Sequence, residues 1–286
     1  CMRIGLSLLI LIDLAVNFPY IRMFYSDEGI LPSSFVSPSW LSGAFSLNLI
    51  NGSFTFQLVL YAMLFIFTFS LLVGYRTQLS TFLVWIFLVS FYNRNLLVTG
   101  AEDKILVVIL FWFLFLPLGA CYSLDSLRKD QPPTAQRVSS MASAAYLLQI
   151  SFIYFFCGYL KTHPQWTTDY TAAGIALSGM PFVKPLGHGL LQYPALLKFL
   201  TVAVLNLERW GPLFFFCPFY TVPLRVITVV AFMCFHVGLL LTMELGLFQW
   251  ISLTALLGFL PTVFWDKITG FLKQKPKHKA AQIASR

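Results

Sequence analysis

Charged residues are scarce in this sequence: Asp, Glu, Lys and Arg make up only 10% of its 286 residues. A soluble domain normally carries about 25% of such residues, so a chain this poor in charge would not stay dissolved in water. Hydrophobic residues reach 58%, and 30 residues are Phe, which suits helices that face acyl chains. The composition therefore excludes an ordinary soluble domain and predicts an integral membrane protein.

The sequence also lacks paired cysteines with the spacing of a metal site or a redox motif. Its five cysteines form no C-x-x-C pair, and Cys157, Cys217 and Cys234 lie inside apolar runs, so we interpret them as buried small hydrophobic residues. Strict alternation of apolar and polar residues is missing as well, which disfavours a membrane β-barrel. No internal repeat and no soluble domain is evident.

Long, continuous apolar runs are what the sequence has in abundance. A straight helical span needs about 20 such residues, and several runs approach that length. The runs lie near 4–21, 54–74, 77–92, 104–120, 139–161, 195–217, 223–246 and 247–265. We predict an all-α, polytopic transmembrane helix bundle with about eight spans. This membrane domain would cover residues 1–266, and residues 267–286 would form a basic cytoplasmic tail.

Two of these runs are less well defined than the others. The run 195–217 contains Asn206, Glu208 and Arg209, which are unusual inside a span. The last two runs could also form one long re-entrant element. Three longer connections separate the runs, at residues 22–53, 121–138 and 162–194; the last of them is rich in Gly and Pro and amphipathic.

Lys and Arg are unevenly distributed between the two sides that eight spans would define. Twelve of the 19 cations fall on the side of the termini, six on the other side, and Arg209 within a span. The positive-inside rule then places both termini in the cytoplasm. Six cations follow Trp265, where anionic lipid headgroups would attract them. No basic groove with interleaved aromatic residues indicates a nucleic-acid partner.

Lys161, at the end of the fifth run, is a first candidate for function. Ser151, Tyr154, Gly158 and Lys161 follow one another at spacings of three, four and three residues, which places them on one helical face. Gly158 would let another backbone or a ligand approach closely. A lysine partly withdrawn from water can act as a general base, whereas a snorkelling lysine reaches the lipid headgroups. The spacing alone leaves both interpretations open.

Other polar residues inside the runs are candidates because charge in hydrocarbon costs at least about 2.5 kcal/mol. His236 lies in the middle of the seventh run and would either handle protons or a ligand, or bond to a backbone carbonyl in the core. We interpret Glu208 and Arg209 as structural, neutralising each other or groups on other helices. Pro212 predicts a kink or a break nearby.

The connection at residues 93–104 crowds amides, carboxylates and a glycine at one mouth of the predicted bundle. Asn93 and Asn95 are its amides. A solvated loop would explain part of this composition. Asp103 or Thr99 could also cap the helix that follows.

Four ordered segments carry a family resemblance. They are Asn93-x-Asn95 with Gly100, Asp103 and Phe115-Leu116-Pro117; Tyr154-Phe155-x-x-Gly158-x-x-Lys161 followed by Trp166; Glu208 with Pro212; and Phe235-His236 with Phe248. Together they resemble the horizontally transferred transmembrane domain family, which is the membrane domain shared with vitamin K-dependent gamma-carboxylase. The similarity covers nearly the whole chain. It implies a multi-pass protein of a bacterial inner (plasma) membrane, since the shorter family members are mostly bacterial.

The resemblance also implies a site. Lys161 would be the catalytic base that receives or relays a proton in the chemistry of a reduced, vitamin K-like quinone, and His236 would line the same cavity. Tyr154 and Gly158 would contribute to the cofactor site, as would Asn93 and Asn95. A secreted or exported peptide would be the substrate by the same resemblance, and the enzyme would be a carboxylase-like lyase or another quinol-dependent membrane enzyme.

Two departures from the family pattern make glutamate carboxylation doubtful. Arg94 stands where a carboxylase would be expected to show histidine. The 286 residues also contain no counterpart of the large extramembrane domain that grips the carboxylase propeptide. Three functions stay open: a quinone-using membrane enzyme, a non-catalytic factor for maturation, export or immunity of a secreted peptide, and a small transporter lined by His236, Glu208 and Arg209.

Overall fold

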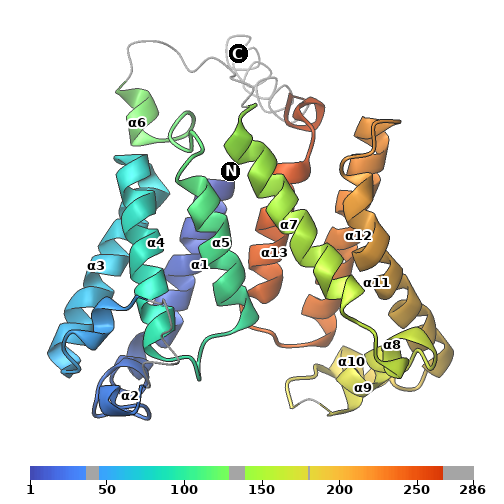
Figure 1. Ribbon diagram of the computed structural model, residues 1–286, viewed down its shortest axis with the longest axis horizontal. Coiled ribbons are helices and arrows are strands. Elements are labelled where there is room, and N and C mark those ends of the chain that lie inside the picture. The colour runs from blue at the N-terminus through green and yellow to red at the C-terminus, as the bar shows by residue number, and fades with distance from the viewer. Residues whose placement is uncertain (37–44, 129–138, 180, 267–286) are drawn as a thin grey trace, which may run out of the picture. The chain divides into compact units, whose positions relative to one another are not determined.

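The computed structural model of the chain describes residues 1–36, 45–128, 139–179 and 181–266 (Figure 1). Regular structure in these ranges is helical, apart from a single β-bridge between Val183 and Met243. The predicted all-α class is therefore confirmed for this part of the chain. The predicted basic tail, residues 267–286, lies outside the described residues.

Each predicted apolar run contains a helix, because continuous apolar sequence without internal Gly-Pro punctuation favours this structure. The helices are α1 (Met2–Asn17), α3 (Phe54–Val73), α4 (Thr77–Arg94), α5 (Ala101–Phe113), α7 (Met141–Tyr159), α11 (Pro194–Phe214), α12 (Thr221–Thr242) and α13 (Phe248–Leu256). α12 and α13 are separate helices, since residues 243–247 between them are not helical. The last two runs thus form two helices and not one continuous helix, and the re-entrant alternative stays a prediction.

Four segments of the described chain are long and apolar enough to cross a membrane: Met2–Tyr25, Phe54–Val73, Met141–Tyr159 and Thr221–Thr242. They identify the chain as a membrane protein. α11 has 21 residues but carries several polar side chains and is not among the four. The larger number of about eight spans, and the cytoplasmic position of both termini, stay predictions.

The predicted long connections contain short helices instead of being wholly irregular. η1 (Phe18–Tyr20) lies at the end of the first apolar run. The first connection holds most of α2 (Ile21–Tyr25), η2 (Ser33–Phe35) and η3 (Leu47–Leu49), and the second holds α6 (Leu124–Leu127). The third holds α8 (Pro164–Thr167), α9 (Ala172–Gly179) and α10 (Pro185–Leu190), and η4 (Leu257–Phe259) follows α13. Proline at the first turn of α8 and α10 suits a helix start, because that N–H has no helical partner.

The chain divides into two compact units. The first consists of Cys1–Tyr146 with Gly246–Ala255, and the second of Leu147–Leu245 with Leu256–Arg286. In the first unit α3 packs against α1 and α4, and α4 packs against α5 (Figure 1). In the second unit α11 packs against α12, α8 and α9, and α10 packs against α12. Cys157 and Cys234 of this unit are exposed and Cys217 is half-buried, so the prediction that these cysteines are buried is wrong.

The end of α3 in the first unit is closed by a buried arginine. Gly74 follows the helix with a φ of 71°, the left-handed conformation that glycine adopts most easily. The Arg3 guanidinium donates to the carbonyl oxygens of Leu71 and Leu72. It also donates to the carbonyl of Tyr122. Arg3, predicted from the sequence only as a cytoplasmic cation, therefore satisfies carbonyls that a helix end leaves without partners.

The start of α4 is capped by Asp125 from α6. Its carboxylate accepts the backbone N–H groups of Arg76 at 2.9 Å and Thr77 at 2.7 Å, and the Thr77 hydroxyl at 2.6 Å. Burial alone would raise the pKa of Asp125, but these hydrogen bonds and the nearby Arg128 guanidinium hold that pKa below its ordinary value. The short α6 thus provides the negative charge that a helix N-terminus favours.

Candidate functional site

Lys161 lies just beyond the end of α7 and turns toward α11. Its ammonium group forms an ion pair with the Glu208 carboxylate, and the two side chains are 22% and 6% exposed. The same nitrogen lies 4.4 Å from the centre of the Trp166 ring, in a cation–π contact. The lysine is therefore held between a buried carboxylate and an aromatic face of its own unit.

Gly158 lies at a close approach between α7 and α11. A Cβ atom at this position would lie 2.7 Å from the backbone nitrogen of Arg209 and 2.8 Å from the Cβ of Glu208. Any larger residue would force the helices apart. Of the two partners that the sequence suggested for Gly158, a backbone or a ligand, the structure places a backbone there.

Arg209 completes this junction. Its Nε donates to the carbonyl of Gly158 at 2.9 Å, and its Nη2 donates to the carbonyl of Lys161 at 3.0 Å. Helix ends leave such carbonyls without intrahelical partners, so the arginine satisfies them. Glu208 therefore binds the side chain of Lys161 just after α7, and Arg209 binds backbone carbonyls at the end of α7. α11 continues through Pro212 to Phe214, so the helix does not break at the proline, and the alternative of a kink stays a prediction.

A pocket of ≈ 490 Å³ opens beside this junction. Lys161 and Trp166 line it together with residues of α9, α10, α11 and α12, among them Ala176, Leu207 and Phe235. Lys161 is the one charged residue among the described residues that line it. The pocket is thus an apolar chamber with a single cationic group, and that group already has a counter-ion in Glu208.

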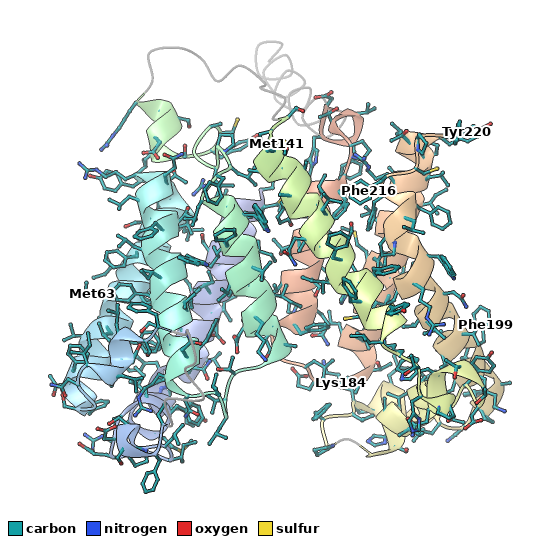
Figure 2. All side chains as sticks on the ribbon, viewed as in Figure 1. Met63, Met141, Lys184, Phe199, Phe216 and Tyr220 are labelled. Carbon is teal, nitrogen blue, oxygen red and sulfur yellow. The ribbon has the colours of Figure 1, made fainter. Side chains whose placement is uncertain are left out.

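The wall of the pocket formed by α9 and α10 is attached to the end of α12. Lys184, labelled in Figure 2, donates to the carbonyl of Leu240 at 2.9 Å and pairs with Glu244 at 2.9 Å. The bridge between Val183 and Met243 adjoins these contacts. Met243 also belongs to a small buried cluster of this unit, so the attachment continues into its core.

His236 and Tyr154 form a second polar contact in the same unit. The Tyr154 hydroxyl and the His236 Nε2 are 2.8 Å apart, and the Tyr154 ring lies 4.2 Å from the ring of Phe232. Both side chains are buried. Neither residue belongs to the set that lines the pocket with Lys161. The structure therefore brings Tyr154 together with His236, and Lys161 together with Glu208, as two separate contacts.

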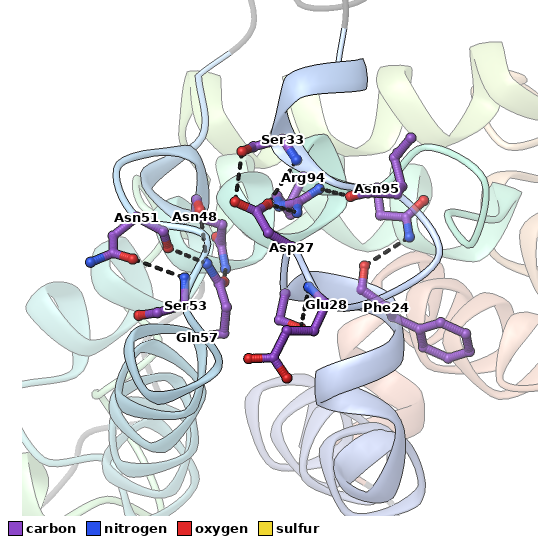
Figure 3. A network of polar contacts seen from close by, with 12 residues as sticks. Phe24, Asp27, Glu28, Ser33, Asn48, Asn51, Ser53, Gln57, Arg94 and Asn95 are labelled. Atoms are coloured by element: carbon purple, nitrogen blue, oxygen red, sulfur yellow. Dashed lines mark hydrogen bonds and ion pairs between the residues drawn. The ribbon is translucent and has the colours of Figure 1, made fainter.

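Asn93 and Asn95 lie in the first unit and stabilise its loops. The Asn93 amide donates to the carbonyl of Phe45 at 2.9 Å. The Asn95 amide donates to the carbonyl of Phe24 at 2.8 Å, as Figure 3 shows. Asp103 was one of the two residues predicted to cap the next helix, and its carboxylate accepts the N–H of Gly100 at 2.8 Å. These contacts are those expected of residues that order a connection.

Arg94, between the two asparagines, is the residue whose environment the sequence did not predict. Its side chain is fully buried, donates to the carbonyl of Leu31 at 2.8 Å and pairs with Asp27 at 3.0 Å (Figure 3). Asp27 in turn accepts two hydrogen bonds from Ser33. The acidic pair Asp27-Glu28 in the connection at residues 22–53 was the sequence feature that could have predicted this environment, because a buried arginine needs an acidic partner.

The fold and this site define a class: an all-helical membrane protein with an apolar pocket that carries one paired lysine. No family model, curated protein or solved structure matches the chain. The family resemblance accordingly rests on the four sequence segments alone.

Proposed function

We propose that the chain is a membrane-embedded enzyme of the horizontally transferred transmembrane domain type, which binds a quinone-like lipophilic molecule beside Lys161. The observation that supports the proposal most is the position of Lys161 in the wall of an otherwise uncharged pocket. A snorkelling lysine would instead extend toward headgroups. Small-molecule sites are mostly apolar chambers with a few well-placed polar groups, and Lys161 with Glu208 fits that description.

The dimensions of the pocket suit such a molecule. Its ≈ 490 Å³ falls within the range of about 300–1,000 Å³ that is usual for small-molecule sites. Ala176, Leu207 and Phe235 provide walls for a ring and an isoprenoid chain. When bound, a reduced quinone would supply an acidic hydroxyl and two electrons. This chain would supply orientation, exclusion of water and proton transfer.

Proton transfer would use Lys161 and Glu208 as a pair. Transfer of one proton from the Lys161 Nζ to the Glu208 carboxylate breaks an N–H bond, forms an O–H bond and leaves a neutral amine. That amine can then accept a proton from a hydroxyl in the pocket, which regenerates the ammonium. Lys161 acts here as the general base, and Glu208 stores the proton beside it. Arg209 keeps the junction in place through the carbonyls of Gly158 and Lys161.

The test uses the full chain in lipid nanodiscs with a reduced short-chain menaquinone as the probe and dissolved dioxygen as the two-electron oxidant, which is reduced to hydrogen peroxide. We expect Lys161→Ala to abolish oxidation of the probe, and methylamine to restore part of it. The matched variant is Lys161→Arg, which keeps the charge and the ion pair but carries a guanidinium that does not deprotonate. Lys161→Arg should fold normally and be inactive. Full activity in Lys161→Arg would contradict the proposed role of the lysine.

The pocket itself is tested by filling it. Ala176→Phe adds a ring inside the chamber and should lower the affinity for the probe by at least about tenfold, which corresponds to 1.4 kcal/mol. Ala195→Phe is the control, since Ala195 is exposed on α11 and does not line the pocket. Unchanged affinity of Ala176→Phe for the probe would show that the probe binds outside this pocket.

A non-catalytic factor for maturation, export or immunity of a secreted peptide is the alternative. In that case the probe would bind without being oxidised, and Lys161→Arg would retain function. A transporter would need His236, Glu208 and Arg209 along one path. These residues bond instead to Tyr154, Lys161 and the carbonyls at the α7 end, and none of the three lines the described pocket.

A further inference from the structure

One face of α11 carries a row of exposed residues. Ala203 in this row also lines the ≈ 490 Å³ pocket, and Asn206 and Trp210 border a groove against α12. Exposed residues follow one another at alternating spacings of three and four: Leu196, Phe199, Ala203, Asn206, Trp210 and Leu213. Phe199, labelled in Figure 2, is 66% exposed, and Trp210 is 55% exposed. A period of 3.5 residues is the pattern of a seam along which two helices pack with knobs into holes. This row of six residues is called the α11 seam below.

Asn206 stands in the middle of the α11 seam; its place at the depth of a membrane span rests on the prediction that α11 is one of about eight spans. It borders a groove of ≈ 460 Å³ together with Ile227 and Ala231, which lie well inside the apolar helix α12. Its amide nitrogen donates to the carbonyl of Val202 at 2.9 Å. Within the described residues, its amide oxygen accepts no hydrogen bond. A face that meets only acyl chains would carry Leu or Phe at this position, because lipid cannot satisfy an amide.

We propose that the α11 seam is the interface with a second copy of this chain. A carboxamide is both a donor and an acceptor, so its best complement is another carboxamide. Copies that insert with the same topology place Asn206 at the same depth, and they can pair their α11 helices in parallel about an axis normal to the membrane. A second copy therefore places its own Asn206 side chain at the same depth as the first, where the two amides can form a hydrogen bond.

The other residues of the α11 seam fit the same arrangement. Ala203 is small and allows close approach next to Asn206, as small residues do at membrane helix interfaces. Phe199 and Trp210 lie one turn to either side and would supply most of the packing. A 3.5-residue repeat corresponds to a left-handed crossing of about 20°. A single amide in such a seam fixes register and favours the dimer over higher assemblies.

The first experiment measures dimerisation of the full chain in liposomes of neutral phospholipid, by single-molecule photobleaching over a range of protein densities. We expect a density-dependent dimer. Asn206→Leu should weaken it about 3- to 20-fold, the range of interhelical hydrogen bonds in membranes. Trp210→Ala should weaken it as well. The control is Phe152→Ala, which removes a ring of similar exposure from α7, and it should leave the dimer unchanged.

A second measurement keeps the inference testable where a variant is made poorly. In a background with the five native cysteines replaced by serine, Leu213→Cys should cross-link between two copies under mild oxidation, whereas Phe152→Cys should not. A wild-type chain that stays monomeric at every density overturns the proposal. A dimer that Asn206→Leu does not weaken, and that Leu213→Cys does not cross-link, also overturns it.

Discussion

The ion pair between Lys161 and Glu208 is the residue-scale feature with the greatest energetic consequence. Glu208 is nearly inaccessible, whereas Lys161 keeps part of its surface exposed. Removing one charge of a buried pair leaves the other without compensation, which costs more than the pair itself contributes. Substitution of either residue alone therefore confounds folding with function. A paired substitution separates them.

Glu208→Gln should lower the free energy of unfolding by about 3 kcal/mol, because Lys161 then faces the interior without a counter-charge. Replacing both residues together, as Lys161→Met with Glu208→Leu, should recover most of that loss and leave the protein inactive. Thermal unfolding in nanodiscs checks both statements. A Glu208→Gln variant that unfolds at the wild-type temperature and is inactive would make Glu208 a purely functional residue.

At the scale of elements, the turn between α3 and α4 shows how distant residues complete helix ends. Arg3 from α1 binds the last carbonyls of α3, and Asp125 from α6 binds the first N–H groups of α4. Gly74 is a local signal for the end of α3, but the two charged caps come from other elements, so the sequence of the turn does not predict them. The α3–α4 hairpin consequently depends on two charged residues that lie outside it.

Asp125→Asn should destabilise the protein at neutral pH by about 1 kcal/mol, because an NH2 group replaces one of the two oxygens that accept hydrogen bonds and leaves its donor without a partner. The pKa of Asp125 is lower in the folded protein than in the unfolded chain, so its charge stabilises the fold above the unfolded pKa. This contribution is lost as the pH falls through the folded pKa. The difference in unfolding temperature between the wild type and Asp125→Asn should thus be constant near neutrality and shrink below about pH 4.

Asp169→Asn is the control for this pH dependence, because Asp169 is exposed and bonds only to the neighbouring Thr168 hydroxyl among the side chains described. It should change the unfolding temperature little at any pH. An Asp125→Asn variant with the same unfolding curve as Asp169→Asn would show that α4 does not need this cap.

Hydrophobic runs in the sequence located every long helix, because continuous apolar sequence is a local property. The environments of the polar residues were harder to predict. Gly158 was recognised as a point of close approach, but not that Glu208 would lie against it and reach Lys161. Arg94 was predicted on a loop and is buried against Asp27, which precedes it by 67 residues. Such pairings depend on how helices meet, and one sequence does not specify that.

At the scale of the whole molecule, the open question is which helices cross the bilayer. The four most apolar segments alone would put both termini on the same side, and so would about eight spans. A reporter fused after Arg286 therefore tests the cytoplasmic orientation but not the number of spans. The two schemes differ at the turns that join α4 to α5 and α11 to α12.

Cysteine labelling at these two turns should distinguish the schemes. With about eight spans, Leu97 lies outside the cell and Tyr220 inside; with four, the positions are reversed. Both side chains are well exposed. In a background without native cysteines, we expect an impermeant maleimide to label Leu97→Cys on intact cells, and Tyr220→Cys only after permeabilisation. The opposite pattern would leave α4, α5 and α11 outside the bilayer core.

The junction between α7 and α11 has a consequence for biosynthesis. α11 carries Lys198, Asn206, Glu208 and Arg209, and each charge near a helix centre opposes insertion from the translocon by about 2.5–3.5 kcal/mol. A solitary α11 would therefore be a poor substrate for lateral release into lipid. α7 is synthesised earlier and presents the carbonyls of Gly158 and Lys161 together with the lysine side chain. α11 would then insert by pairing with α7, which is already in the bilayer. The order of the helices along the chain would therefore also be the order in which they assemble.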